Sequence, residues 1–373
     1  MKATKTLLLT LGFFLIIGLS SCSEEEVLGD TINIPDKFSV DIPNAISNTN
    51  GGLSARISGD GDGIIEGDEI YAALPHFIRL GEASAEIVEV TLIIGAVLEQ
   101  LNITSYEFTD ETDDRMKRID LTEDVIRGGV SYEFEMTMID VEDGALALQL
   151  LWNSSNGVEG IGILQPFNIN RIENLNNPEA FYQIEYSEND PDYEATMLVT
   201  ISGIDLDEDA SGTIEDDEKG NIDNLQMFVG KNGDIVEVRG NSNHPEITII
   251  DQNFTGGRNY AFVGRGDETA DIGVVNLWLP PSSLTTNSFV EGGVYSVFNV
   301  LDDEIKAVGF DDQDIIDGIL VEAQSPAYFN SNGFMTTGAD NRPEGFEVAF
   351  SNLSGMTPFV PVEVRDLAIS FLQ

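Results

Sequence analysis

Tyr132-Glu133-Phe134-Glu135-Met136-Thr137-Met138 is the stretch that decides the fold. Its apolar residues alternate with polar ones, which is typical of a strand with one buried and one solvated face. Similar runs continue to the C-terminus, and the chain after residue 102 is therefore expected to be mostly antiparallel sheet. The expected strands are Leu146 to Trp152, Phe181 to Tyr186, Glu194 to Ile201, Leu225 to Val229, Ile235 to Val238, Tyr260 to Val263, Ile272 to Leu279 and Leu367 to Phe371.

Two Asn-Gly pairs lie between such runs, Asn156-Gly157 and Asn232-Gly233. Each pair supplies the positive φ that a tight hairpin needs. Neighbouring strands should therefore pair directly. No repeat of fixed period is present, which argues against propellers and solenoids.

A different period precedes the strands. From Glu69 to Leu101 the apolar residues recur at steps of three and four, which indicates a helix; they are Ile87, Val90, Ile94, Val97, Leu98 and Leu101. Gly81 is expected to divide this stretch into two helices.

These patterns predict an α+β fold, predominantly antiparallel β, in which a curved meander sheet wraps an N-terminal helical segment. The arrangement resembles the half-barrel periplasmic lipoprotein carriers in architecture only, since no motif supports that match. The alternative is a set of tandem β-sandwich modules. The expected divisions are a signal peptide at 1–21, an acidic tether at 22–52 with one extended piece at Phe38 to Ile42, a helical segment at 53–101 and a β-rich body at 102–373.

The composition is strongly acidic, with 66 acidic against 18 basic residues among 373 and a net charge of −48. Nucleic acid is therefore excluded as a partner. Such a carboxylate excess suits cation binding, and adaptation to a saline habitat explains it equally well. Cys22 is the only cysteine, so the chain can form no internal disulfide.

The N-terminus combines two lysines, Lys2 and Lys5, with an apolar core from Leu7 to Leu19, as a secretory signal does. Leu19-Ser20-Ser21-Cys22 resembles the lipobox of bacterial lipoproteins, which implies cleavage before Cys22 and acylation of its thiol. The alternatives are an ordinary cleaved signal or a short uncleaved anchor.

The acidic run Ser23-Glu24-Glu25-Glu26 follows directly. It resembles the signals that send lipoproteins of the Bacteroidota to the outer face of the outer membrane, and a solvated linker is the alternative. The expected location is the outer membrane, lipid-anchored and facing the cell surface, with the periplasmic face as the other option.

The segment from Asp207 to Glu218 resembles an EF-hand calcium loop. By that resemblance Gly212 would permit the sharp turn at the loop's centre, and Ile214 would point into the core. The resemblance implies Ca²⁺ ligands at Asp207, Asp209, Ser211, Thr213, Glu215 and Glu218. The flanking sequences read as strands where EF-hands have helices, and a solvated acidic turn is the alternative interpretation.

A weaker copy of the loop runs from Ser58 to Glu69, with Ser58 in place of the first aspartate. Its candidate ligands are Ser58, Asp60, Asp62, Ile64, Glu66 and Glu69. A glycine-rich turn capped by Asp68 at the start of the helix explains the same residues.

Catalytic motifs are sparse. His76 is expected to pack or to lie at the surface, and His244 to lie in a turn-rich polar loop. Both tryptophans, Trp152 and Trp278, fall within strand patterns and are expected in the core. The sequence therefore predicts a non-enzymatic, calcium-binding envelope lipoprotein with an unidentified ligand. The alternatives are a surface glycan hydrolase using paired carboxylates and a carrier of an apolar molecule.

Overall fold

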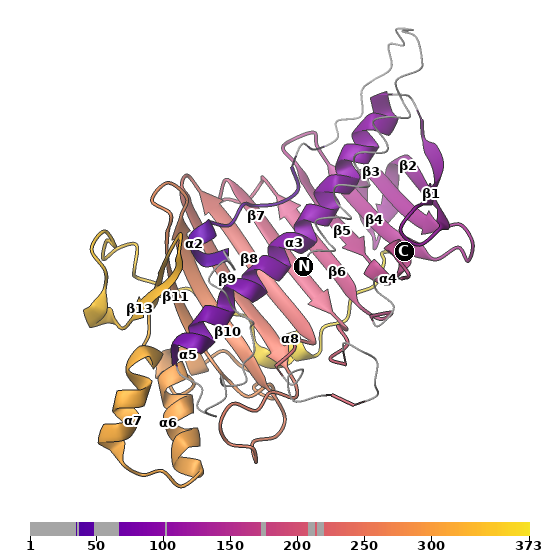
Figure 1. Cartoon of the computed structure of the whole chain (residues 1–373). Coiled ribbons are helices and arrows are strands. Elements are labelled where there is room, and N and C mark those ends of the chain that lie inside the picture. The colour runs from indigo at the N-terminus through magenta and orange to yellow at the C-terminus, as the bar shows by residue number, and fades with distance from the viewer. Residues whose placement is uncertain are drawn as a thin grey trace.

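A computed structural model describes residues 35, 37–47, 67–100, 103–172, 177–207, 213–214 and 220–373. Its centre is an open, curved, antiparallel sheet in which thirteen described strands pair in the order of the chain (Figure 1). The predicted α+β meander is therefore confirmed, and tandem sandwiches are not observed in the described chain. The strands are β1 (Ser105–Asp110), β2 (Arg115–Arg127), β3 (Val130–Asp140), β4 (Leu146–Asn153), β5 (Glu159–Leu164), β6 (Phe181–Ser187), β7 (Ala195–Ser202), β8 (Asn224–Asn232), β9 (Ile235–His244), β10 (Arg258–Asp267), β11 (Ile272–Trp278), β12 (Ala327–Asn330) and β13 (Gly333–Thr337).

The alternation that predicted β3 sets its two faces. Phe134, Met136 and Met138 point to the same face, where Met136 and Met138 are buried and Phe134 stacks on Trp152 of β4 at 5.3 Å between ring centroids. The Asn232-Gly233 hairpin is also confirmed, because Asn232 pairs with Ile235 and Gly233 has φ 60°.

One long helix, α3 (Gly67–Gln100), lies across the inner face of the sheet (Figure 1). Gly81 does not divide it, so that prediction was wrong. A Cβ at residue 81 would collide with the side chain of Met227 in β8. Gly81 is therefore a point of close helix-to-sheet approach, for which a residue without a side chain is needed. No helix among the described residues is long and apolar enough to cross a membrane.

The chain ahead of α3 also packs on the inner face. Phe38 is fully buried and lies 5.4 Å from the ring of Tyr186, and the short helix α2 (Asn44–Ser47) buries Ile46. A Cβ at Gly273 of β11 would overlap Ile46, so a glycine is required there. Residues 37–47 therefore belong to the folded body, and the expected tether over 22–52 does not describe them, because their apolar side chains complete the core. Phe38 to Ile42 forms no strand.

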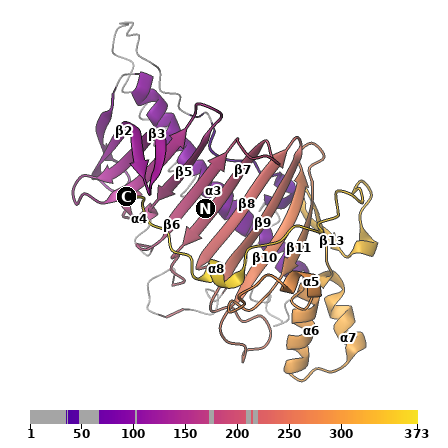
Figure 2. The same ribbon diagram turned by 180° about the vertical axis from the view of Figure 1, so that it is seen from behind.

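The C-terminal part of the chain covers the outer face (Figure 2). A second apolar cluster forms there around Val263, Trp278, Tyr328 and Phe346. The predicted strand at Leu367 to Phe371 was wrong, since this segment joins no sheet. Its alternation is real, but it arises because Leu367, Ile369 and Phe371 are each partly covered while their neighbours Ala368 and Ser370 are exposed.

Side chains of the sheet hold the backbone of this C-terminal segment. Asn241 and Asn224 donate to the carbonyls of Phe359 and Arg365, each at 2.9 Å. Gln149 of β4 donates to the carbonyl of Leu372 at 3.0 Å and accepts from its N–H at 2.8 Å. The remaining helices were not expected from the sequence: α4 (Pro166–Ile169), α5 (Phe289–Gly292), α6 (Val297–Ala307), α7 (Gln313–Ile319), α8 (Pro361–Arg365), and two 3-10 turns at Leu320–Ala323 and Ala339–Asn341.

Candidate functional site

The loop with the calcium-ligand pattern joins β7 to β8, two antiparallel neighbours. The strand flanks predicted for it are therefore confirmed, because the described residues on either side belong to β7 and β8 and not to the two helices of an EF-hand. Of its candidate ligands, Asp207 and Thr213 lie within the described residues, and Asp209, Ser211, Glu215 and Glu218 lie outside them.

Hydrogen bonds close the stem of this loop. The N–H of Ile204 donates to the carbonyl of Asp223 at 3.1 Å, directly beyond the ends of the two strands. One step further out, the side chain of Asn221 donates to the carbonyl of Leu206 at 3.2 Å. The N–H of Asp207 donates to the carboxylate of Asp205 at 3.1 Å. The first ligand position therefore begins from a fixed stem.

His244 holds the exit of the same loop. It is the last residue of β9 and is fully buried, so the expected turn-rich loop was wrong at this position. Its Nδ1 lies 2.8 Å from the carbonyl oxygen of Gly220, and its Nε2 lies 2.8 Å from the hydroxyl of Ser242. A carbonyl only accepts, so Nδ1 carries the proton and Nε2 accepts from Ser242. Burial lowers the pKa of His244 to about 4, so the ring is neutral.

Aromatic rings enclose this histidine. Phe77 of α3 meets His244 edge-on at 5.0 Å between centroids, and Tyr260 of β10 lies 4.8 Å away. A neutral histidine in such a place is shielded from solvent and from any substrate, and it acts as a packing and anchoring residue. His76 lies in α3, where burial lowers its pKa.

The other predicted sites fall mostly outside the described residues: Cys22 and the candidates Ser58, Asp60, Asp62, Ile64 and Glu66 of the weaker loop. Glu69 lies in the first turn of α3, and the side chain is not among those described. No group of three or more His, Cys, Asp or Glu side chains suited to a metal ion occurs within the described part of the chain.

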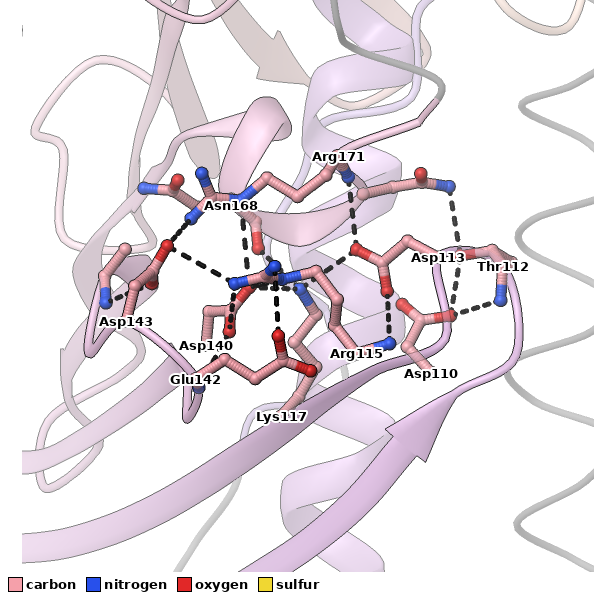
Figure 3. Close-up of polar contacts among 12 residues, drawn as sticks. Asp110, Thr112, Asp113, Arg115, Lys117, Asp140, Glu142, Asp143, Asn168 and Arg171 are labelled. Carbon is pink, nitrogen blue, oxygen red and sulfur yellow. Dashed lines mark hydrogen bonds and ion pairs between the residues drawn. The ribbon is translucent and has the colours of Figure 1, made fainter.

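Sequence reasoning missed a buried ion network at the β1 to β4 end of the sheet (Figure 3). Lys117 of β2 is fully buried, and its ammonium donates to Asp113 at 3.2 Å, to Asp140 at 3.1 Å and to the carbonyl of Asn168 in α4 at 3.0 Å. No sequence motif marked it, because its members come from three separate connections that only the folded sheet brings together.

Arginines close this network from outside. Arg115 binds Asp140 through Nε and Nη2, and both Arg115 and Arg171 reach Asp143 on the β3 to β4 turn. Burial alone would raise the pKa of Asp140, but the bonds from Arg115 and Lys117 outweigh it and lower the pKa to about 2. A catalytic lysine must lose a proton and meet a substrate. Lys117 is enclosed between carboxylates, and its role is therefore structural.

A second buried ion pair lies toward the other end. Arg258 of β10 donates to Glu304 of α6 at 2.5 Å, and its guanidinium carbon lies 3.8 Å from the ring centroid of Phe254. The second oxygen of Glu304 accepts from the N–H groups of Ile250 and Asp251 at 2.9 and 3.1 Å. This pair fastens α6 to the end of the sheet.

The structure thus places the protein in a class defined only by its fold. That fold is an open antiparallel meander sheet with a long helix packed on its inner face. In the comparisons with known proteins, no family model, no curated protein and no solved structure matches this chain. Its function must therefore be argued from its own residues.

Proposed function

We propose that this chain is a lipid-anchored protein of the cell envelope that binds Ca²⁺ in the β7 to β8 loop and acts by binding a ligand, without catalysis. The observation that carries the proposal is the ligand pattern from Asp207 to Glu218 on a loop whose stem is closed by the bonds of Ile204, Asn221 and His244. A fixed stem reduces the entropy lost when a loop orders around an ion.

Calcium would then stabilise the fold, because an ion bound only by the folded state adds free energy as its concentration rises. At about 100 times the dissociation constant the gain is about 2.7 kcal/mol. The test is the thermal melt of the chain starting at Ser23 with calcium, with magnesium and with chelator. We expect a calcium-specific upward shift.

The matched variants are Asp207→Ala, which removes the first ligand, and Asp311→Ala, which removes one exposed carboxylate at the start of α7. The calcium shift should disappear in the first and persist in the second. An unchanged calcium-dependent melting shift in Asp207→Ala would show that this loop is not the calcium site.

The lipid anchor rests on the resemblance of Leu19 to Cys22 to a lipobox. Labelling of cells with an alkyne fatty acid should mark the wild type and spare Cys22→Ser, and only the wild type should sediment with outer membranes. Equal labelling of both would reject acylation at this cysteine. Protease access on intact cells would separate a cell-surface from a periplasmic position.

Binding is favoured over catalysis by the state of the ionisable groups. His244 is enclosed by rings and neutral, and Lys117 is enclosed by carboxylates. The apolar-carrier alternative gains no support in the described residues, because α3 and residues 37–47 fill the inner face of the sheet with their own side chains.

A further inference from the structure

A cleft of about 510 Å³ opens on the outer face of the sheet, and none of its lining residues belongs to the calcium-ligand pattern of the β7 to β8 loop. The tip of the β8 to β9 hairpin, β9, β10 and the C-terminal segment all contribute to it. Its lining consists of Asp192, Tyr193, Asn232, Ile235, Glu237, Arg265, Ala349 and Phe350. The volume falls within the range of about 300–1,000 Å³ that is usual for small-molecule sites.

The aromatic wall of the cleft is fixed in place. The ring of Tyr193 packs against Gly230, where any Cβ would come within 2.6 Å of it, and against Phe228 at 5.6 Å between centroids. Its hydroxyl donates to Glu237 at 2.8 Å. Burial and this bond raise the pKa of Tyr193 to about 12, so the phenol stays protonated.

Arg265 fixes another part of the lining. Its Nε donates to Glu237 at 3.0 Å, and its Nη1 donates to the carbonyls of Ala349 and Phe350, each at 3.1 Å. The C-terminal segment is thereby tied to β10, and Phe350 is held at the cleft. Because these groups are already ordered, a ligand would meet a preformed surface and would lose less free energy on binding.

The charges select the ligand. Two carboxylates, those of Asp192 and Glu237, face one guanidinium that is already bonded to Glu237 and to backbone carbonyls. The cleft therefore repels anions such as nucleotides, fatty acids and sulfated molecules. Both oxygens of Glu237 already accept bonds from within the protein, one from Arg265 and one from Tyr193.

We propose that this cleft binds a neutral sugar. A pyranose ring has an apolar C–H face, which fits the rings of Tyr193 and Phe350, and a rim of hydroxyls, which fits the side chains of Asp192 and Asn232. The proposal deepens the ligand-binding role stated above and does not rest on the calcium loop, whose test by melting is separate.

The experiment uses the chain starting at Ser23 and saturation-transfer NMR with four probes, the methyl glycosides of glucose, galactose, mannose and N-acetylglucosamine. At least one should bind, with a dissociation constant of about 1 mM for a single sugar unit. Methyl glucuronide should bind at least about threefold more weakly than methyl glucoside because of the negative rim.

Three variants locate the binding. Ala349→Trp places a large ring in the cleft from an exposed position, and Asp192→Ala removes an exposed hydrogen-bonding group; both should weaken binding at least about tenfold, or 1.4 kcal/mol. Asp234→Ala, in the β8 to β9 hairpin but outside the cleft, should leave the affinity for the sugar unchanged. Absence of binding for all four glycosides, tighter binding of the glucuronide, or full binding in a stably folded Ala349→Trp would overturn the proposal.

Discussion

Lys117 and Arg258 are buried cations near opposite ends of one sheet, and they are held differently. Lys117 in β2 is fully buried between two carboxylates, Asp113 and Asp140, neither of which has exposed side-chain surface. Arg258 in β10 is 6% exposed and meets one carboxylate, Glu304. That carboxylate also accepts two backbone N–H groups. Asp113 does so too, whereas Asp140 depends more on the cations Arg115 and Lys117.

The difference decides how much stability is lost when each cation is removed, because it determines which buried carboxylates remain without a partner. A buried carboxylate that loses its cation but keeps N–H donors retains part of its stabilisation. Asp140 takes bonds from Arg115 and Lys117 and from the N–H of Glu142, while Asp113 accepts from the N–H groups of Arg115 and Arg171. Removing Lys117 leaves two buried carboxylates side by side, of which Asp140 keeps Arg115 and Asp113 keeps no cation among the described residues. Removing Arg258 leaves one buried carboxylate, that of Glu304.

The largest effect is therefore expected for Lys117→Met, which keeps the length of the side chain and removes its charge. Breaking a buried pair by removing one partner costs about 3–5 kcal/mol, and the upper part of this range applies because Asp113 is left without its cation beside the buried carboxylate of Asp140. Urea unfolding followed by circular dichroism measures the loss.

Arg118→Met is the matched control on the same strand. Its partners Glu107 and Asp120 are partly exposed, and exposed pairs contribute about 0–1 kcal/mol. Partial restoration of stability by adding Asp113→Asn to Lys117→Met, which removes the carboxylate left without its cation, would support the charge argument. A loss in Lys117→Met no greater than that in Arg118→Met would contradict it.

A smaller and more local loss is expected for Arg258→Met, about 3 kcal/mol, at the low end of the range for a broken buried pair. Glu304 would keep its bonds from Ile250 and Asp251. Hydrogen exchange should quicken at those two amides and in α6, while β2 and β3 stay protected.

The double variant Arg258→Met with Glu304→Gln sharpens this result. The amide oxygen still accepts from the two N–H groups, and the uncompensated charge is gone, so part of the loss should be recovered. If exchange instead quickened equally in β2 and β3, the two ends of the sheet would not be independent.

The sequence predicted the parts of the fold that depend on local alternation. Met136 and Met138 identified the buried face of β3, and Asn232-Gly233 identified a hairpin, because both signals are complete within a few residues. β5 was not among the expected strands, and glycines stand at its residues Gly160 and Gly162. They are small because Phe38 and Val88 press against the strand at those positions.

Other errors arose where long-range contacts decide the structure. The stretch from Gly240 to His244 reads as a turn, yet it extends β9, since Asn241 bonds both Asn259 and the C-terminal segment. The alternation of apolar and polar residues at Leu367 to Phe371 correctly indicated that one side of the segment is covered. Such a pattern does not show whether the backbone pairs with a neighbouring strand. The Lys117 network and the outer cleft had no local signal at all.

The smallest expected effect concerns His244, a buried group with neutral partners between these two charged networks. The folded state lowers its pKa to about 4 from an ordinary 6.5, so the unfolded chain binds the proton more readily. Its contribution to stability is full above pH 6.5 and is lost as the pH falls from there toward 4. Between pH 7.5 and pH 5 the loss is about 2 kcal/mol.

The variant His244→Asn has no titratable group at this position. Comparing it with the wild type isolates the pH dependence of stability that is due to His244, because both proteins contain the same carboxylates. Urea unfolding at several pH values should show a wild type that loses about 2 kcal/mol more than the variant over that interval. His76 is present in both proteins and cancels in the difference. Parallel pH profiles would mean that the fold accommodates protonated His244 at no cost in stability. The carbonyl of Gly220 can accept from Nδ1 in either charge state, so the penalty arises mainly from burying the charged ring, and the hydroxyl of Ser242 would also have to turn to accept from the new N–H at Nε2.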